Sequence, residues 1–253
     1  MTLFDWIQKL FSEYWRSFLR GTGNTMLMAI TGTLVGFLIG LLIAVIRTIP
    51  VRRNTGKAQK IFLKAVNAVC AAYVEIVRGT PMLVQALIVH YSIFVPMQVP
   101  AMLSAIIIIS VNTGAYMAEI ARGGILSVDK GQYEGAAAIG MGHFQTMTSV
   151  VLPQAIRNIM PSIGNEFVVN IKDSSVLSVI SITELMFVSK QAGGAYAKFV
   201  PAYVICALIY FVLTFTVTRL LRLCERLLEG KKHYTICGSQ SDSRAEIKIK
   251  ENE

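Results

Sequence analysis

The sequence lacks the motifs by which a chain binds ATP or a metal ion. It contains no Gly-x-x-x-x-Gly-Lys-Ser/Thr pattern, the loop that cradles nucleotide phosphates, so we expect no ATP site on this chain. Its four cysteines never occur as Cys-x-x-Cys, and its histidines have no metal-ligand spacing. We therefore expect no disulfide, no metal site and no enzymatic activity.

A removable signal and an internal repeat are also missing. Acidic Asp5 precedes the first basic residue, and no small-residue cleavage site follows, so no secretory signal peptide is expected. No internal repeat is visible, which counts against secondary transporters built from inverted repeats.

Apolar residues dominate what is present. The 253 residues are 54% hydrophobic, and the mean hydropathy of +0.56 indicates a polytopic membrane protein. The net charge of +9 could suggest a nucleic-acid partner. The basic residues fall at the ends of apolar runs, however, which indicates membrane topology and no nucleic acid.

The chain begins with an amphipathic stretch and continues with five apolar segments. Residues 4–19 have helical spacing and two tryptophans, which predicts an interfacial helix in a region 1–20. Five transmembrane helices are predicted, at 24–46, 65–94, 100–121, 158–188 and 200–218. The first repeats glycine every four residues, either for close helix packing or by chance, at Gly32, Gly36 and Gly40. The expected fold class is an all-α membrane protein.

Basic residues are distributed unevenly between the two ends of these segments. The turn 47–64, the loop between the third and fourth segments and the tail carry most of the 24 Lys and Arg residues. Because cytoplasmic loops carry the excess of Lys and Arg, we expect the N-terminus outside and the C-terminus in the cytoplasm. The charged tail 226–253 is expected to be disordered.

Polar side chains interrupt three apolar segments at similar depths. Counted from the cytoplasmic ends, they lie about 15 to 22 Å into the membrane. An unpaired charge at that depth costs about 2.5 kcal/mol or more, so these groups should face one another or a wet cavity. The candidate binding residues are Glu75, Arg78, Asn112, Asp173 and Ser174.

The chemistry of this set suits a small zwitterion. The stretch 79–81, Gly-Thr-Pro, breaks the helix at membrane depth, where irregular backbone is tolerated mainly beside a cavity. The Arg78 guanidinium can bind a carboxylate bidentately, and Asp173 or Glu75 can bind an ammonium. A purely structural alternative is that Glu75 and Arg78, at i and i+3, pair with each other and staple the bundle.

The stretch 131–153, GQYEGAAAIGMGHFQTMTSVVLP, lies between the third and fourth segments. Its alanines predict a short helix over 133–139. Gly140 stands where a C′ glycine would end that helix. A second short helix is predicted over 143–152, closed by Pro153. The two helices would form a compact knob too short to cross a bilayer.

This knob resembles the cytoplasmic coupling loop of the membrane subunits of ABC importers. The family pattern is Glu-Ala-Ala, three residues, Gly, nine residues, then Ile-x-Leu-Pro. Gly135 replaces the first Ala and Val150 replaces the Ile. The matching positions are Glu134, Ala136, Gly140, Leu152 and Pro153. The alternative is an amphipathic interfacial loop with a chance match.

Three more stretches look like signatures of the polar amino-acid branch of this family: VEIVRGTP at 74–81, TGAYMAEIARGGI at 113–125 and NIKDSSVLSVI at 170–180. The likeness covers roughly residues 20 to 225. It implies a type I ABC importer transmembrane fold over 21–225, with its coupling loop at 123–157. It also implies ligand contacts at Glu75, Arg78, Asp173 and Ser174, whereas Asn112 is added from its depth alone.

The resemblance further implies a permease subunit for polar amino acids in the lipid of a bacterial inner membrane. ATP and Mg would bind a separate ATP-binding cassette ATPase, and an extracytoplasmic solute-binding protein would deliver the ligand. A second permease copy or a paralogue would complete the pathway. The implied ATPase contacts are Glu134, Gly135, Ala136, Gly140, Leu152 and Pro153.

Two other classes of protein remain open on the sequence. An ion-coupled secondary amino-acid transporter would move protons or sodium through Glu75 and Asp173 and would need no ATPase. A receptor-like or structural membrane protein would use 131–153 merely to dock a cytoplasmic partner.

Overall fold

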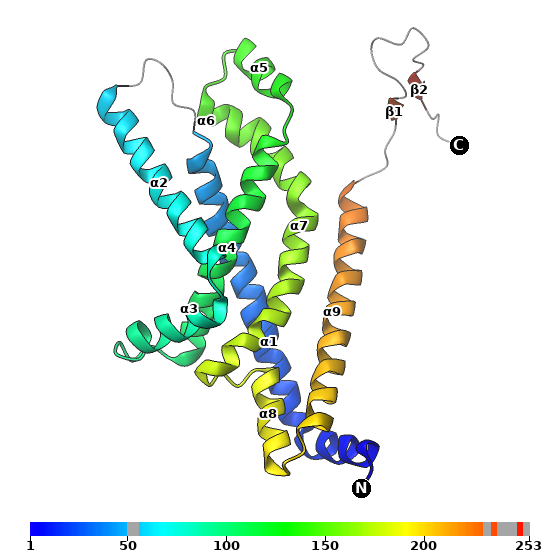
Figure 1. Cartoon of the computed structure of the whole chain (residues 1–253). Coiled ribbons are helices and arrows are strands. Elements are labelled where there is room, and N and C mark those ends of the chain that lie inside the picture. Colours follow the sequence, from blue (N-terminus) through cyan, green and yellow to red (C-terminus); the bar gives the residue numbers. More distant parts are fainter. Residues whose placement is uncertain (50–55, 230–233, 237–246, 250–253) are drawn as a thin grey trace.

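The computed structural model describes residues 1–49, 56–229, 234–236 and 247–249, and nearly all of them are helical. In Figure 1 the helices form an elongated bundle, with α5 and α6 at one end and the N-terminus at the other. The elements in chain order are α1 (Leu3–Arg47), α2 (Lys57–Gly79), α3 (Met82–Val89), the π turn η1 (His90–Phe94), α4 (Ala101–Leu126), α5 (Lys130–Ala138), α6 (His143–Thr146), the π turn η2 (Met147–Val151), α7 (Leu152–Asp173), the 3-10 turn η3 (Ser174–Ile180), α8 (Leu185–Ala195), α9 (Phe199–Glu229), β1 (Tyr234–Ile236) and β2 (Ile247–Ile249).

Within the described ranges, three helices are long and apolar enough to cross a membrane: α1, α4 and α9. They correspond to the first, third and fifth predicted spans. The second and fourth segments are built differently, because each contains a break.

α1 is one continuous helix of 45 residues. The sequence predicted two elements here, an interfacial helix over 4–19 and a separate span over 24–46, so that division was wrong. Leu10 and Phe18 are buried in a cluster with side chains of α8 and α9. The first turns of α1 therefore pack on protein, and Figure 1 shows them crossing the foot of α8 and α9 before the helix turns to run along α4.

Glycines bring α1 into close contact with α4. A Cβ atom added at any of the three repeated glycines would come within 2.5 to 2.8 Å of an α4 side chain, closer than real Cβ atoms approach. The facing pairs are Gly32 with Ile109, Gly36 with Thr113, and Gly40 with Met117. The four-residue repeat thus serves close helix packing rather than reflecting chance composition.

Polar side chains connect the three central helices. Thr113 of α4 donates a hydrogen bond to Asn170 Oδ1 of α7 at 3.0 Å. Asn170 Nδ2 in turn donates to Thr33 Oγ1 of α1 at 2.8 Å. Thr113, Asn170 and Thr33 are all buried, and these hydrogen bonds give their side chains the partners that buried polar groups need. Near the α5 end, Glu119 of α4 forms an ion pair with Arg47 of α1.

The second segment is not one helix over 65–94. α2 ends at Gly79, and α3 begins only after Thr80 and Pro81. Proline lacks an N–H and disfavours a helical residue before it, and Thr80 is accordingly extended, with ψ 145°. The predicted break is therefore present in the structure.

The fourth segment is likewise not one helix over 158–188. α7 passes into η3, and Ser181 then adopts a left-handed conformation with φ 62°. Glu184 starts α8 afresh, because its carboxylate accepts hydrogen bonds from the backbone N–H groups of Met186 and Phe187 at 2.7 and 2.6 Å. The capping role of Glu184 was not predicted from the sequence.

α9 continues to Glu229, well past the predicted span 200–218. β1 and β2 then pair antiparallel, with Tyr234 opposite Ile249. The predicted disorder of the tail 226–253 falls largely on residues outside those described, so it stays a prediction.

Candidate functional site

One side chain, Gln85, stabilises the break between α2 and α3. Its Nε2 donates hydrogen bonds to the carbonyls of Val77 and Thr80 at 2.8 and 3.0 Å. Its Oε1 accepts a hydrogen bond from Asn112 Nδ2 of α4 at 3.1 Å. Backbone groups freed by Pro81 are thereby satisfied, as an apolar surrounding requires. Sequence reasoning missed Gln85, although it is an amide in an otherwise apolar helix.

Arg78 lies on the exposed side of α2, one residue before its C-terminal end. Its guanidinium lies 5.4 Å from the ring centroid of Tyr116 on α4, a cation–π contact. Asn112 and Tyr116 are one helical turn apart, so the structure brings Arg78 and Asn112 together along the boundary between α2 and α4. Glu75 is also exposed, and in the described part of the chain it forms no ion pair with Arg78.

The other two predicted binding residues lie at the junction of α7 and η3. Ser174 is fully buried, and its hydroxyl donates to the Ile171 carbonyl at 2.8 Å. Asp173 is half-buried at the last position of α7. Within the described residues, no hydrogen bond or ion pair links this pair to Arg78, Glu75 or Asn112. One chain thus presents the polar groups as two separate sets.

The knob begins with α5, which covers most of the predicted helix 133–139. The Asp129 carboxylate caps it by accepting from the Gly131 N–H at 2.7 Å. Gly140 follows the helix end with φ +81°, the left-handed conformation that favours glycine, so its predicted helix-ending role is confirmed. Glu134 and Gly135 are exposed, whereas Ala136 is buried.

The second half of the knob differs from the prediction. α6, η2 and α7 follow one another without an interruption, so Pro153 does not close a helix over 143–152. Pro153 instead occupies the first turn of α7, directly after the π turn η2. A π turn widens the helix, and the first turn of a helix tolerates a missing N–H. Leu152 is half-buried in this stretch.

The tip of the knob exposes two large apolar side chains. Ile139 is 79% exposed and Phe144 is 80% exposed, one on each side of Gly140. Exposed apolar groups on a polar loop indicate a contact surface, and sequence reasoning did not single out either residue. The base of the knob is tied down, because Tyr133 donates a hydrogen bond to the Ile125 carbonyl at 3.2 Å. Burial there raises the pKa of the Tyr133 phenol.

The family profile described as "Binding-protein-dependent transport system inner membrane component" matches residues 58–230. The chain belongs to this family. It is therefore a permease subunit of an ABC transporter and not an enzyme, and the ATPase is a separate chain. Membership supports an importer over the ion-coupled alternative, and it makes the chain a multi-pass inner-membrane protein that works with ATPase, substrate-binding and permease partners.

Curated relatives and a solved structure are similar over most of the permease. The glutamine transport system permease protein of Escherichia coli (strain K12) is 29% identical over 232 residues, which cover 89% of this chain and 98% of that protein. The L-cystine transport system permease protein of Bacillus subtilis (strain 168) is 36% identical over 200 residues, which cover 78% of this chain and 82% of that protein. A solved structure titled as an amino acid ABC transporter with histidines is 35% identical, with a TM-score of 0.74, and covers 85% of this chain and 96% of its own. The resemblance to amino-acid permeases is thus confirmed.

Proposed function

We propose that this permease forms half of an ATP-driven import pathway for polar amino acids. It crosses the membrane five times, with the N-terminus outside and the C-terminus in the cytoplasm. α1, α4 and α9 supply three crossings, and the broken segments around α2–α3 and α7–η3 supply two. The 22 residues of α7 extend about 33 Å, which matches the hydrocarbon core of a bilayer.

The proposed ligand site includes Arg78 and Glu75 on α2, Asn112 on α4, and Asp173 with Ser174 at the end of α7. Arg78 would bind the carboxylate of the amino acid, and Glu75 or Asp173 its ammonium group. The exposure of Arg78 and Glu75 in one chain supports a pathway closed by a second copy or a paralogue. The named ligands of the two curated relatives, glutamine and cystine, are zwitterions of this kind.

We expect a separate ATPase to drive transport by binding the knob at 131–153. An ATP-binding cassette ATPase, which holds ATP and Mg, would dock on Glu134, Gly135, Ala136 and Gly140, with Leu152 and Pro153 anchoring the loop to α7. An extracytoplasmic solute-binding protein would deliver the ligand from the other side. The observation that carries this proposal is the pair of exposed side chains, Ile139 and Phe144, at the tip of an otherwise anchored loop.

Adjacent substitutions at the tip test the docking surface. Phe144→Glu should abolish copurification of the ATPase with the permease, because it puts a charge where an apolar contact forms. Gln145→Glu adds the same charge one residue away, also on an exposed side chain, and should retain the ATPase. Equal retention by both variants would contradict docking at this tip.

A matched pair of cations on α2 tests the ligand site. Arg78→Ala should abolish ATP-dependent amino-acid uptake into proteoliposomes that contain the whole transporter, while ATPase copurification stays normal. Lys64→Ala removes an equally exposed cation from the same helix and should leave uptake unchanged. Uptake that survives Arg78→Ala would place the ligand elsewhere.

A further inference from the structure

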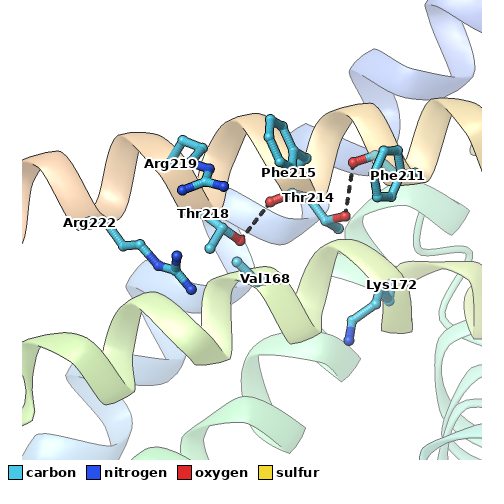
Figure 2. A pocket seen from close by; sticks show the side chains of 8 residues that line it. All are labelled: Val168, Lys172, Phe211, Thr214, Phe215, Thr218, Arg219 and Arg222. Carbon is cyan, nitrogen blue, oxygen red and sulfur yellow. Dashed lines mark hydrogen bonds between the residues drawn. The ribbon is translucent and has the colours of Figure 1, made fainter.

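A groove between α7 and α9 contains none of the residues proposed to bind the amino acid. It has a volume of about 270 Å³ and is open along one side of the bundle. Its lining combines three cations with apolar and aromatic side chains: Lys172, Arg219, Arg222, Val168, Phe211 and Phe215. We call it the basic groove (Figure 2).

The cations of the basic groove come from two antiparallel helices. α7 and α9 run in opposite directions here, and a helical side chain leans toward the N-terminal end of its own helix. Lys172 therefore leans along the groove toward the arginines, while Arg219 and Arg222 lean toward Lys172. In Figure 2, Lys172 and Arg222 lie at opposite ends of the groove, and Arg222 extends from α9 along it.

The positive charge of the basic groove is only partly offset within the described residues, where Asp173 interacts electrostatically with the adjacent Lys172. Its lining includes no carboxylate, and none of the three cations forms an ion pair with another described residue. The nearest acids along the chain are Asp173, next to Lys172, and Glu225, three residues after Arg222, and Asp173 is not among the lining residues. Arg219 and Arg222 directly follow the predicted span 200–218, at the expected cytoplasmic end, where converging positive charge attracts anionic headgroups.

The remaining groups select the kind of anion. The hydroxyls of Thr214 and Thr218 donate to carbonyls of their own helix at 2.8 and 2.7 Å, so the cations alone supply free donors. Phe211 and Phe215 are 63% and 50% exposed beside them. From Phe211 to Arg222 the groove extends about 16 Å along α9. The cations reach the groove from both of its ends, and the Arg219 guanidinium lies 5.0 Å from the centroid of the Phe215 ring. Positive charge beside exposed aromatic rings matches a ligand that joins an anionic head to hydrocarbon chains.

We propose that the basic groove is a binding site for an anionic phospholipid. Its phosphate lies among Lys172, Arg219 and Arg222, and its acyl chains lie along Phe211 and Phe215. Basic pockets between transmembrane helices on the cytoplasmic side bind such headgroups. The bound lipid bridges α7 and α9, and α7 is the helix that carries Asp173 at its end.

Equilibrium binding of phosphatidylglycerol to the delipidated full-length chain in detergent tests the proposal, with phosphatidylcholine as the neutral reference. The wild-type chain should prefer phosphatidylglycerol, and Arg222→Gln should weaken that binding about fivefold without changing phosphatidylcholine binding. Arg222→Lys should restore most of it, because the charge returns. Arg157→Gln removes an exposed cation of α7 that is not in the groove and should behave as wild type. Arg219→Gln provides a second groove variant if Arg222→Gln does not elute as a folded species.

Three results would overturn the proposal. Equal losses in Arg222→Gln and Arg157→Gln would assign the preference to surface charge in general. Displacement of phosphatidylglycerol by millimolar inorganic phosphate would make the groove a site for a free anion. Loss of lipid binding when two permease chains assemble would assign the groove to a second copy. Because the measurement is of lipid binding, its failure leaves the proposed transport function untouched.

Discussion

α4 and α2 lie against each other in the bundle, yet they are packed very differently. α4 buries 14 of its 26 residues, whereas α2, with 23 residues, buries only Val74. α4 faces the glycines of α1 on one side and Asn170 of α7 on another. α2 is attached through polar contacts, such as the hydrogen bond from the Tyr73 hydroxyl to the Val111 carbonyl at 2.6 Å.

This difference in burial distinguishes α4, which is part of the packed scaffold, from α2, which carries the exposed Arg78 and Glu75. A helix with few buried apolar contacts opens and shifts at a lower free-energy cost than a close-packed one. Arg78 and Glu75 therefore lie on the helix that is least fixed by its own chain. Asn112 lies on the close-packed helix α4. The proposed site therefore combines residues of a rigid helix, α4, with residues of a more mobile helix, α2.

The largest effect is expected where α1 meets α4. In Gly40→Leu the new side chain would collide with Met117 and with the backbone nitrogen of Ala118, which lies 2.6 Å from an added Cβ. Backbone cannot move aside cheaply, so we expect a loss of about 3 kcal/mol or more and little folded protein. Gly23→Leu is the control, since nothing lies within 4 Å of a Cβ there. Thermal unfolding in detergent compares them, and equal stability would disprove close packing at this boundary.

A smaller loss is expected at the buried polar connection. Asn170→Leu removes both of its hydrogen bonds, to Thr113 and Thr33, and should cost about 1 to 2 kcal/mol. Thr31→Val is the matched control, because the Thr31 hydroxyl donates only to carbonyls of its own helix. The same unfolding assay measures both. A neutral Asn170→Leu would mean that packing alone fixes α7 against α4.

Substitutions of Gln85 test the helix break between α2 and α3 and its link to α4. Gln85→Leu leaves the Thr80 carbonyl and Asn112 without their partner, so stability should fall by about 1 kcal/mol and uptake should fall strongly. Gln85→Glu retains an acceptor for Asn112 but not the donor to Thr80. If Gln85→Glu transports as wild type, the link to α4 rather than the break itself governs uptake.

The smallest effect is expected on the outer face of α2. Ile76 is 65% exposed, so Ile76→Ala should change the stability of the single chain by no more than about 0.5 kcal/mol. Ile109→Ala makes the same substitution at a fully buried position of α4 and should cost about 2 to 5 kcal/mol. If Ile76→Ala destabilises only the assembled transporter, α2 is the contact with the second permease.

Patterns fixed by local spacing could be predicted from the sequence. The left-handed glycine at 140, the break before Pro81 and the close-packing glycines each depend on the chemistry of one or a few positions. The single helix α1 could not be predicted, because Gly21, Gly23 and Asn24 at its change of pattern are residues that commonly end a helix. Gly21 instead lies against Leu185 and Val188, a contact that only the fold supplies. Nor could Gln85 and Asn170, since their partners depend on which helices become neighbours in three dimensions.

The unbroken run from α6 through η2 to α7 has a mechanical consequence. From His143 to Asp173 the helical turns follow one another without a loop, over a helix length of about 46 Å, and the run contains two places that can bend, the π turn η2 and Pro161 inside α7. A force applied to the tip at Phe144 therefore reaches α7 through continuous helix and is delivered as a tilt or a change of bend at η2 and Pro161. A displacement of the knob is therefore carried toward Asp173 by helical backbone, with no loop in between to absorb it.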